Sequence, residues 1–179
     1  MRTEVISNEN FRSEFHEVKE VVSLISSITQ ELNAIDTSFS KGGNSSSALK
    51  LAIGQFLGDW NRDLLIQQDF PSRRLPSSHV QVDFQKELLL PESNRKVQVT
   101  LEIFGDNRQA VAANLFKLEL AARNYAKFGI AIGIGVCVDK ELKKLGWDGS
   151  TATSDEYEFA LLHTYSRFIE TPIILVAVA

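Results

Sequence analysis

The first thirty residues repeat apolar side chains at the spacing of an α-helix. In "FRSEFHEVKEVVSLISSITQEL" they recur every three or four residues, which places them on one helical face. The spacing predicts a helix from about residue 9 to 33. The stretch "DTSFSKGGNSSS" then interrupts the pattern and ends in serines that favour a helix N-terminus. A second helix is therefore predicted through "ALKLAIGQFLGDWNRDLLIQQ".

Two strand-like stretches follow, and each carries one acid. Side chains alternate along a strand, so in "HVQVDFQKELLL" Val82 and Phe84 share one face and Asp83 points to the other. In "KVQVTLEIF" the apolar positions alternate in the same way, and Glu102 lies on the opposite, polar face. The turn "PESNRK" joins the stretches into a β-hairpin. Because acids lower strand propensity, a matched pair on one face raises the question of a function.

The rest of the chain alternates helical and strand patterns. "GDNRQAVAANLFKLELAARNYAKFG" predicts a helix begun by Asp106 or Asn107 and closed by Gly129. "IAIGIGVCV" and "TPIILVAVA" are apolar enough for strands buried on both faces. Between them "DKELKKLGWDG" and "SDEYEFALLHTYSRFIE" predict two helices, the second with Thr153 and Glu156 at capping-box spacing. The predicted order is α-α-β-β-α-β-α-α-β, an α/β protein.

Composition favours one domain over residues 1–179, because 44% of the side chains are apolar and only four prolines occur. The single cysteine, Cys137, lies in an apolar run, so we expect a buried thiol and a cytoplasmic setting. The N-terminus lacks the apolar core of a secretion signal, and no segment reaches the roughly 20 apolar residues that span a bilayer. We therefore expect no membrane partner.

The formal charge of −4 disfavours a sequence-independent nucleic-acid binder. A specific binder remains compatible with this charge, since acids at a metal site and on outer helices can coexist with a locally basic cleft. The candidates for such a cleft are Arg73, Arg74, Arg95, Lys96 and Arg108.

The paired acids suit a hard divalent cation. Mg²⁺ prefers oxygen ligands, usually one or two carboxylates together with water and substrate phosphate. Bound between Asp83 and Glu102, it would polarise a phosphodiester and lower the pKa of a bound water, which is the chemistry of DNA hydrolysis. The alternative is that both acids are solvated strand residues, and their spacing alone leaves both interpretations open.

The order of motifs resembles a known family. The run from "VDF" through "LEIFGDNRQAVAANLFKLELAARNYAKFGIAIGIGVCV" to "TPIILVAV" is similar to the BglII/BstYI/BamHI-type restriction endonucleases of the PD-(D/E)XK superfamily. In that group an Asp opens the first strand of a hairpin, and a Glu lies in the second within a pattern like E-x-Q-F-G-N. A helix and an apolar strand follow. The likeness covers residues 44–179, which would form a catalytic core after an N-terminal helix and loop over residues 1–43.

This resemblance implies a restriction-endonuclease-like fold, with a central mixed β-sheet flanked by helices. It also implies a Mg²⁺-dependent type II restriction endonuclease that hydrolyses double-stranded DNA at a short specific site. By the same resemblance Asp83 is the first acid and Glu102 the second, and both would bind the metal.

The third catalytic position departs from the family pattern. Phe104 stands where the superfamily has Lys and the closest relatives have Gln or Glu, and phenylalanine can neither orient a water nor stabilise a developing anion. The candidate substitutes are Gln98 and Thr100 on the same strand face and Lys117 on the next helix. Lys117 also fits a plain surface lysine on an amphipathic helix.

Cutting both strands of a palindrome calls for two sites related by a two-fold axis, so a homodimer is expected. Arg73 and Arg74, in the loop before Asp83, would contact guanine or phosphate, and Arg108 would contact a phosphate. Two alternatives stay open. One is an inactive DNA- or protein-binding module that retains the fold, which Phe104 favours, and the other is a repair nuclease of the same superfamily.

Overall fold

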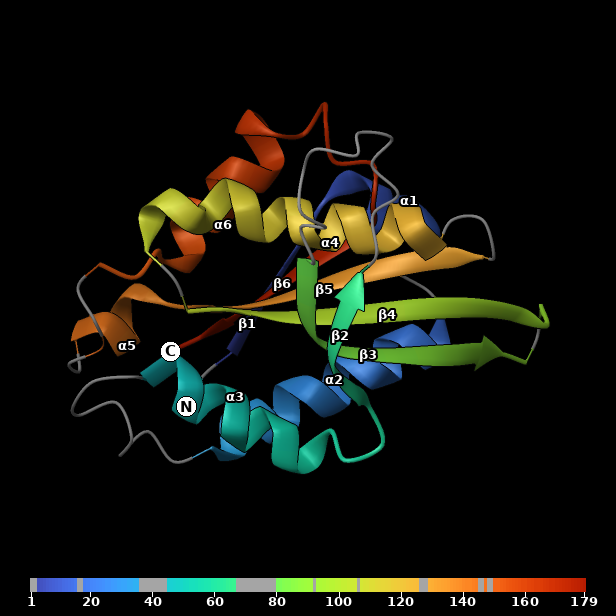
Figure 1. The fold of residues 1–179 in the computed structure, drawn as a ribbon, viewed down its shortest axis with the longest axis horizontal. Helices are drawn as coiled ribbons and strands as arrows, with labels where there is room; N and C mark the ends of the chain where they lie inside the picture. Colours follow the sequence, from blue (N-terminus) through green and yellow to red (C-terminus); the bar gives the residue numbers. More distant parts are fainter. Residues whose placement is uncertain are drawn as a thin grey trace.

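A six-stranded mixed β-sheet forms the centre of the computed structural model (Figure 1). The structure describes residues 3–15, 18–35, 45–66, 80–91, 93–105, 107–125, 129–144, 147 and 150–179. The strand order is β1-β6-β5-β4-β3-β2, with β5 parallel to both β4 and β6 and the other neighbours antiparallel. The strands are β1 (Thr3–Ser7), β2 (Asn61–Ile66), β3 (Val80–Leu90), β4 (Arg95–Phe104), β5 (Ile130–Val138) and β6 (Ile173–Val178).

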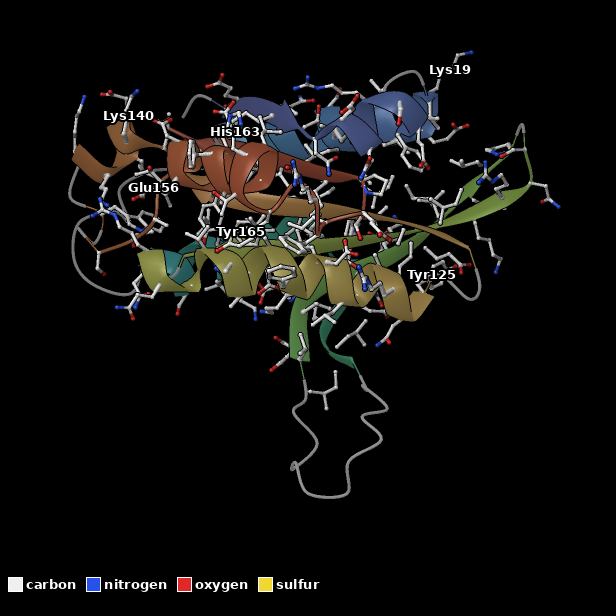
Figure 2. All side chains as sticks on the ribbon, turned by 90° about the horizontal axis from the view of Figure 1, so that it is seen from above. Lys19, Tyr125, Lys140, Glu156, His163 and Tyr165 are labelled. Atoms are coloured by element: carbon white, nitrogen blue, oxygen red, sulfur yellow. The ribbon has the colours of Figure 1, made fainter. Side chains whose placement is uncertain are left out.

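Helices cover both faces of this sheet. In Figure 1, α4 (Val111–Tyr125) and α6 (Ser154–Phe159) lie above the sheet, while α2 (Lys19–Ala34) and α3 (Ser45–Phe56) lie below it. Figure 2, which looks down on α4, shows Tyr165 beside that helix, and its ring centroid lies 5.5 Å from that of Phe116. The shorter elements are α1 (Glu9–Phe15), the 3₁₀ turn η2 (Arg108–Ala110), α5 (Lys140–Lys144) and the π-helical turn η3 (Ala160–Thr164).

Strand β4 supplies side chains to two separate cores. Val97, Val99 and Leu101 pack with side chains of α2 and α3, whereas Phe104 packs with side chains of α4 and α6. The alternation expected for β4 is present, whereas on β3 Val82 and Phe84, predicted to share one face, pack in different clusters. The face that carries Glu102 is nevertheless not open to water, because α4 covers it, and Glu102 is only 4% exposed.

The N-terminal region differs from the prediction of one long helix and a loop. It begins with β1, which pairs antiparallel with β6, and continues with the two helices α1 and α2. Asn8 explains the turn between β1 and α1. Its side-chain oxygen accepts hydrogen bonds from the backbone N–H groups of Phe11 and Ile173, and its amide donates to Thr171 O. The first residues are therefore part of the sheet, through a contact with the far end of the chain that local periodicity does not reveal.

The second predicted helix was too long. Helix α3 ends at Phe56, and Asn61–Ile66 form β2, paired antiparallel with β3. The last apolar residues of this stretch are contiguous, which suits a strand as well as a helix, and the pairing with β3 decides between them. The predicted element order was therefore wrong in its first half; the observed order is β-α-α-α-β-β-β-α-β-α-α-β.

From β3 onward the predicted elements are present. The helix after β4 is preceded by a 3₁₀ turn that Asn107 caps by accepting a hydrogen bond from Gln109 N, and the helix ends at Tyr125. The capping box of Thr153 and Glu156 is confirmed, although α6 is short and continues as η3. Cys137 is a buried free thiol, as expected. Within the described residues, no helix is long and apolar enough to cross a bilayer.

Candidate active site

Asp83 and Glu102 meet at a fork in the sheet. Strands β3 and β4 are paired up to Phe84 and Leu101, and this register sets the two acids opposite each other. Beyond that point β3 turns away from β4 and stays paired with β2, which crosses the direction of the sheet in Figure 1. Side chains take over the hydrogen bonding there. Asp83 N donates to Glu102 Oε2 (3.0 Å), and Ile103 N donates to Asp83 Oδ2 (2.9 Å).

Each acid also holds one lysine, and the two lysines come from helices on opposite faces. Lys117 Nζ, from α4, donates to Glu102 Oε1. Lys50 Nζ, from α3, lies 2.6 Å from Asp83 Oδ1. All four carboxylate oxygens of the acid pair therefore have a hydrogen-bond or ion-pair partner, and two positive charges face two negative ones.

The carboxyl group of Glu102 is strongly perturbed. Its burial, and next the charge of Asp83, raise the pKa of Glu102 to about 7, against the opposing effect of Lys117. A buried carboxylate next to a like charge is costly to ionise, because both desolvation and repulsion disfavour the charged form. This position therefore favours an additional positive charge.

Two residues of this cluster were not singled out from the sequence, Lys50 and Asp63. Lys50 Nζ lies 2.7 Å from Asp63 Oδ1 on β2, so one ammonium group bridges Asp63 and Asp83. Burial lowers the pKa of Lys50, but its hydrogen bonds to the two acids outweigh this effect and raise the pKa overall. Asp63 was missed because the sequence prediction placed its segment, β2, in a helix. A signal for Lys50 was present, since it is the sole charged residue within the sequence of α3.

The candidate substitutes for the third group lie at different distances from the acids. Lys117 contacts Glu102 directly. Gln98 is opposite Glu87 in the hairpin, four residues from Glu102, which is about 13 Å along a strand. Thr100 accepts a hydrogen bond from Gln85 (3.2 Å). The structure thus brings Lys117 to the acid pair and does not bring Gln98 there.

Phe104 is a core residue. It is fully buried and stacks on Tyr157 with ring centroids 4.5 Å apart. Gly135, which is opposite Glu102 on β5, leaves room for the ring, because a Cβ atom at that position would collide with Phe104. The position that carries a polar catalytic group in the resembling enzymes is thus filled by packing in this chain.

The predicted DNA contacts are only partly visible. Arg73 and Arg74 lie outside the described residues. Arg108 is 66% exposed at its side chain and pairs through Nε with Oε1 of Glu156, a residue of α6 that Figure 2 labels. Arg95 and Lys96 begin β4, six or more residues before Glu102, so they lie about 20 Å from the acids along the strand. These two residues do not form one cleft with the acid pair.

The donor set of the acid pair fits Mg²⁺. Its donors are carboxylate oxygens from two adjacent side chains, and Mg²⁺ commonly takes one or two carboxylates while water and substrate phosphate complete its shell. Within the described residues, no three His, Cys, Asp or Glu side chains cluster as a complete protein-only metal cage. A site of two acids would depend on those outside ligands.

Comparison with known proteins assigns the chain to a family. The family model of restriction endonuclease BglII/BglIII matches residues 3–178. The chain belongs to this family. It is accordingly a type II restriction endonuclease, a site-specific deoxyribonuclease. The match includes the N-terminal residues that the sequence resemblance left out, in agreement with the place of β1 in the sheet.

A solved structure supports the fold. The crystal structure of restriction endonuclease BglII complexed with a DNA 16-mer is similar, with a TM-score of 0.69 and 15% sequence identity. The similarity covers 100% of this chain and 78% of the BglII chain. At this identity the likeness shows a shared restriction-endonuclease fold. None of the curated protein sequences compared matches the chain.

Proposed function

We propose that this chain is a Mg²⁺-dependent restriction endonuclease that hydrolyses phosphodiester bonds of double-stranded DNA at a short specific site, with Asp83 and Glu102 as metal ligands. The observation that supports this proposal is the convergence of Asp83, Glu102 and Lys117 at the fork between β3 and β4. Bound Mg²⁺ would supply the charge that polarises the phosphodiester and lowers the pKa of a water.

Lys117 is proposed as the third catalytic group. Its ammonium reaches Glu102 from α4, and so it replaces a group that Phe104 cannot supply. A positive donor beside the metal ligands would stabilise the charge that develops on the attacked phosphate. Gln98 is the weaker candidate, because its position along β4 separates it from both acids.

The DNA-binding part of the proposal rests on arginines and on symmetry. Arg73 and Arg74 would contact DNA from the segment that leads into β3, and Arg108 would contact a phosphate after exchanging its partner Glu156. A homodimer would place two such sites on a palindrome. The proposed setting is the cytoplasm, where Cys137 remains a thiol.

Cleavage of plasmid and phage DNA, with and without Mg²⁺, tests the proposal. The wild-type protein should give discrete fragments that sequencing assigns to one short site, and EDTA should abolish them. Asp83→Ala should remove cleavage, and Lys117→Met should lower the rate by about 100-fold or more. Gln98→Ala is the matched control and should retain most activity.

Three results would contradict parts of this proposal. Retained cleavage in Asp83→Ala would exclude the acid pair as the metal site. Loss of activity in Gln98→Ala together with full activity in Lys117→Met would assign the role of third catalytic group to Gln98 instead of Lys117. DNA binding without any cleavage by the wild-type protein would favour the binding module.

A further inference from the structure

The two lysines at the acid pair differ in their surroundings. Lys117 holds Glu102, whose side chain is only 5% exposed. Lys50 instead lies between two carboxylates of unequal burial, at 2.6 Å from Asp83 and 2.7 Å from Asp63. The side chain of Asp83 is 14% exposed and that of Asp63 is 52% exposed. Lys50 therefore has an inner partner at the site and an outer partner at the surface.

The inner partner is one of the proposed metal ligands. A divalent cation bound to Asp83 would lie within a few ångströms of the ammonium of Lys50, and like charges at such distances repel strongly near a protein surface. Lysine carries its charge on a flexible stem with three donors. Because Asp63 already accepts one of these donors, Lys50 can give up Asp83 and keep an ion-pair partner.

We propose that Lys50 is an internal counter-ion, which neutralises Asp83 in the metal-free protein and is retained by Asp63 when a divalent cation binds Asp83. This inference rests on the proposed metal site at Asp83 and Glu102. Lys50 is a positioning residue in this scheme, since it acts on the reaction through Asp83. It lowers metal affinity by competition, and Asp63 limits the loss by holding the displaced ammonium.

The backbone supports the role of Asp63 as a fixed acceptor. Asp63 has a φ of 51°, in the left-handed region, and lies where the register between β2 and β3 skips the pair of Asp63 and Asp83. A residue other than glycine adopts this conformation at a cost, which the surrounding structure must offset. The ion pair with Lys50 is one contact that holds Asp63 there.

Metal binding without DNA tests the inference. Mn²⁺, which accepts the same oxygen ligands, is titrated into the full chain, and free Mn²⁺ is measured by electron paramagnetic resonance. Lys50→Gln should bind Mn²⁺ about tenfold more tightly than wild type, in the usual range of coupling between two sites. Lys50→Met provides a second uncharged variant if Lys50→Gln folds poorly, and Lys50→Arg, which keeps the charge, should stay close to wild type.

Asp63 provides the sharper part of the test. In the wild-type background, Asp63→Asn should weaken Mn²⁺ binding several-fold, because the displaced Lys50 then loses its ion pair with Asp63. In the Lys50→Gln background, the same substitution should weaken Mn²⁺ binding by less than about twofold. Equal effects in both backgrounds would overturn the inference, as would unchanged or weaker binding in Lys50→Gln and Lys50→Met. Lys86→Gln is the matched control, since Lys86 on β3 also pairs with an exposed aspartate, Asp59, in the turn between α3 and β2.

Failure of the metal site itself is distinguished by Asp83→Asn. If this variant binds Mn²⁺ as tightly as wild type, the proposed function is wrong at its metal ligands, and the counter-ion inference fails with it. If Asp83→Asn loses binding while the Lys50 variants match wild type, only the counter-ion inference is wrong.

Discussion

At the scale of single residues, the candidate site combines two acids whose positions the sequence predicts with two lysines whose positions it does not predict. Strand alternation and the matched hairpin suffice to place Asp83 and Glu102 together. The position of Lys117 depends on how α4 packs over β4, which no local pattern specifies. The position of Lys50 depends on how α3 packs against the opposite face of the sheet. Contacts of this kind join elements on opposite faces of the sheet, so local periodicity does not reveal them.

The perturbed pKa of Glu102 predicts a pH dependence of stability. Because folding raises this pKa to about 7, the folded state binds the proton more tightly than the unfolded state does. The stabilisation is complete below the unfolded pKa and is lost as the pH rises through the folded value, so the free energy of unfolding falls between about pH 4.5 and 7. In metal-free urea unfolding at pH 5 and pH 8, wild type should lose on the order of 2 kcal/mol relative to Glu102→Gln.

Saturating Mg²⁺ should flatten this pH dependence, because a bound cation stabilises the ionised form of Glu102. Identical pH profiles for wild type and Glu102→Gln, without metal, would show that Glu102 titrates normally.

Burial of Phe104 predicts which substitutions it tolerates. Phe104→Leu keeps an apolar group against Tyr157 and should retain most activity, with a loss of about 1 to 2 kcal/mol of stability. Phe104→Lys places a charge in a closed core and should lose several kcal/mol, so it should not restore a catalytic amine. Chemical denaturation and cleavage rates measured on the same preparations check both variants. A stable and faster Phe104→Lys enzyme would show that this position opens toward the acids.

At the scale of elements, the structure departs from the sequence prediction where pairing partners are far apart in the chain. Strands β3 and β4 and helix α4 have clear periodicity, β5 and β6 are apolar runs, and all were predicted. β1 was missed because its five residues are stabilised by β6, more than 160 residues away. β2 was predicted as part of a helix because a short apolar run fits both the helical and the strand period. Because of this error, Asp63 was not recognised as a neighbour of the acid pair. The candidate site was thus predicted on its hairpin side and missed on its β2 side.

The junction at Asn8 predicts a large stability effect from one amide. Asn8 is 7% exposed, and its side chain makes hydrogen bonds with three backbone groups that join β1, α1 and the segment before β6. Asn8→Ala would leave these groups unsatisfied, and it should lower the free energy of unfolding by about 2 to 3 kcal/mol. Urea denaturation measures the change. Asn10→Ala, which removes a more exposed amide bonded to Glu170 O, should cost less than half as much.

At the scale of the whole molecule, an acidic protein must present a local positive surface to DNA. The chain carries a formal charge of −4, and several of its cations are paired with acids within the structure. An exposed cation of this kind can contribute to DNA binding if it exchanges its internal acid for a phosphate. Such an exchange costs little at exposed sites, because surface ion pairs contribute only about 0 to 1 kcal/mol.

Arg108 provides the test of this exchange. If it gives up Glu156 for a phosphate, Arg108→Ala should weaken DNA binding about equally on specific and unrelated duplexes, and the slope of log affinity against log salt should decrease by about 1. Arg123→Ala is the matched control, since Arg123 is also exposed and paired with a glutamate, Glu119, near the other end of α4. Fluorescence anisotropy across a salt series, with Ca²⁺ in place of Mg²⁺ to prevent cleavage, measures both variants. A loss confined to the specific duplex would instead assign Arg108 to base recognition, and equal slopes for Arg108→Ala, Arg123→Ala and wild type would remove it from the DNA interface.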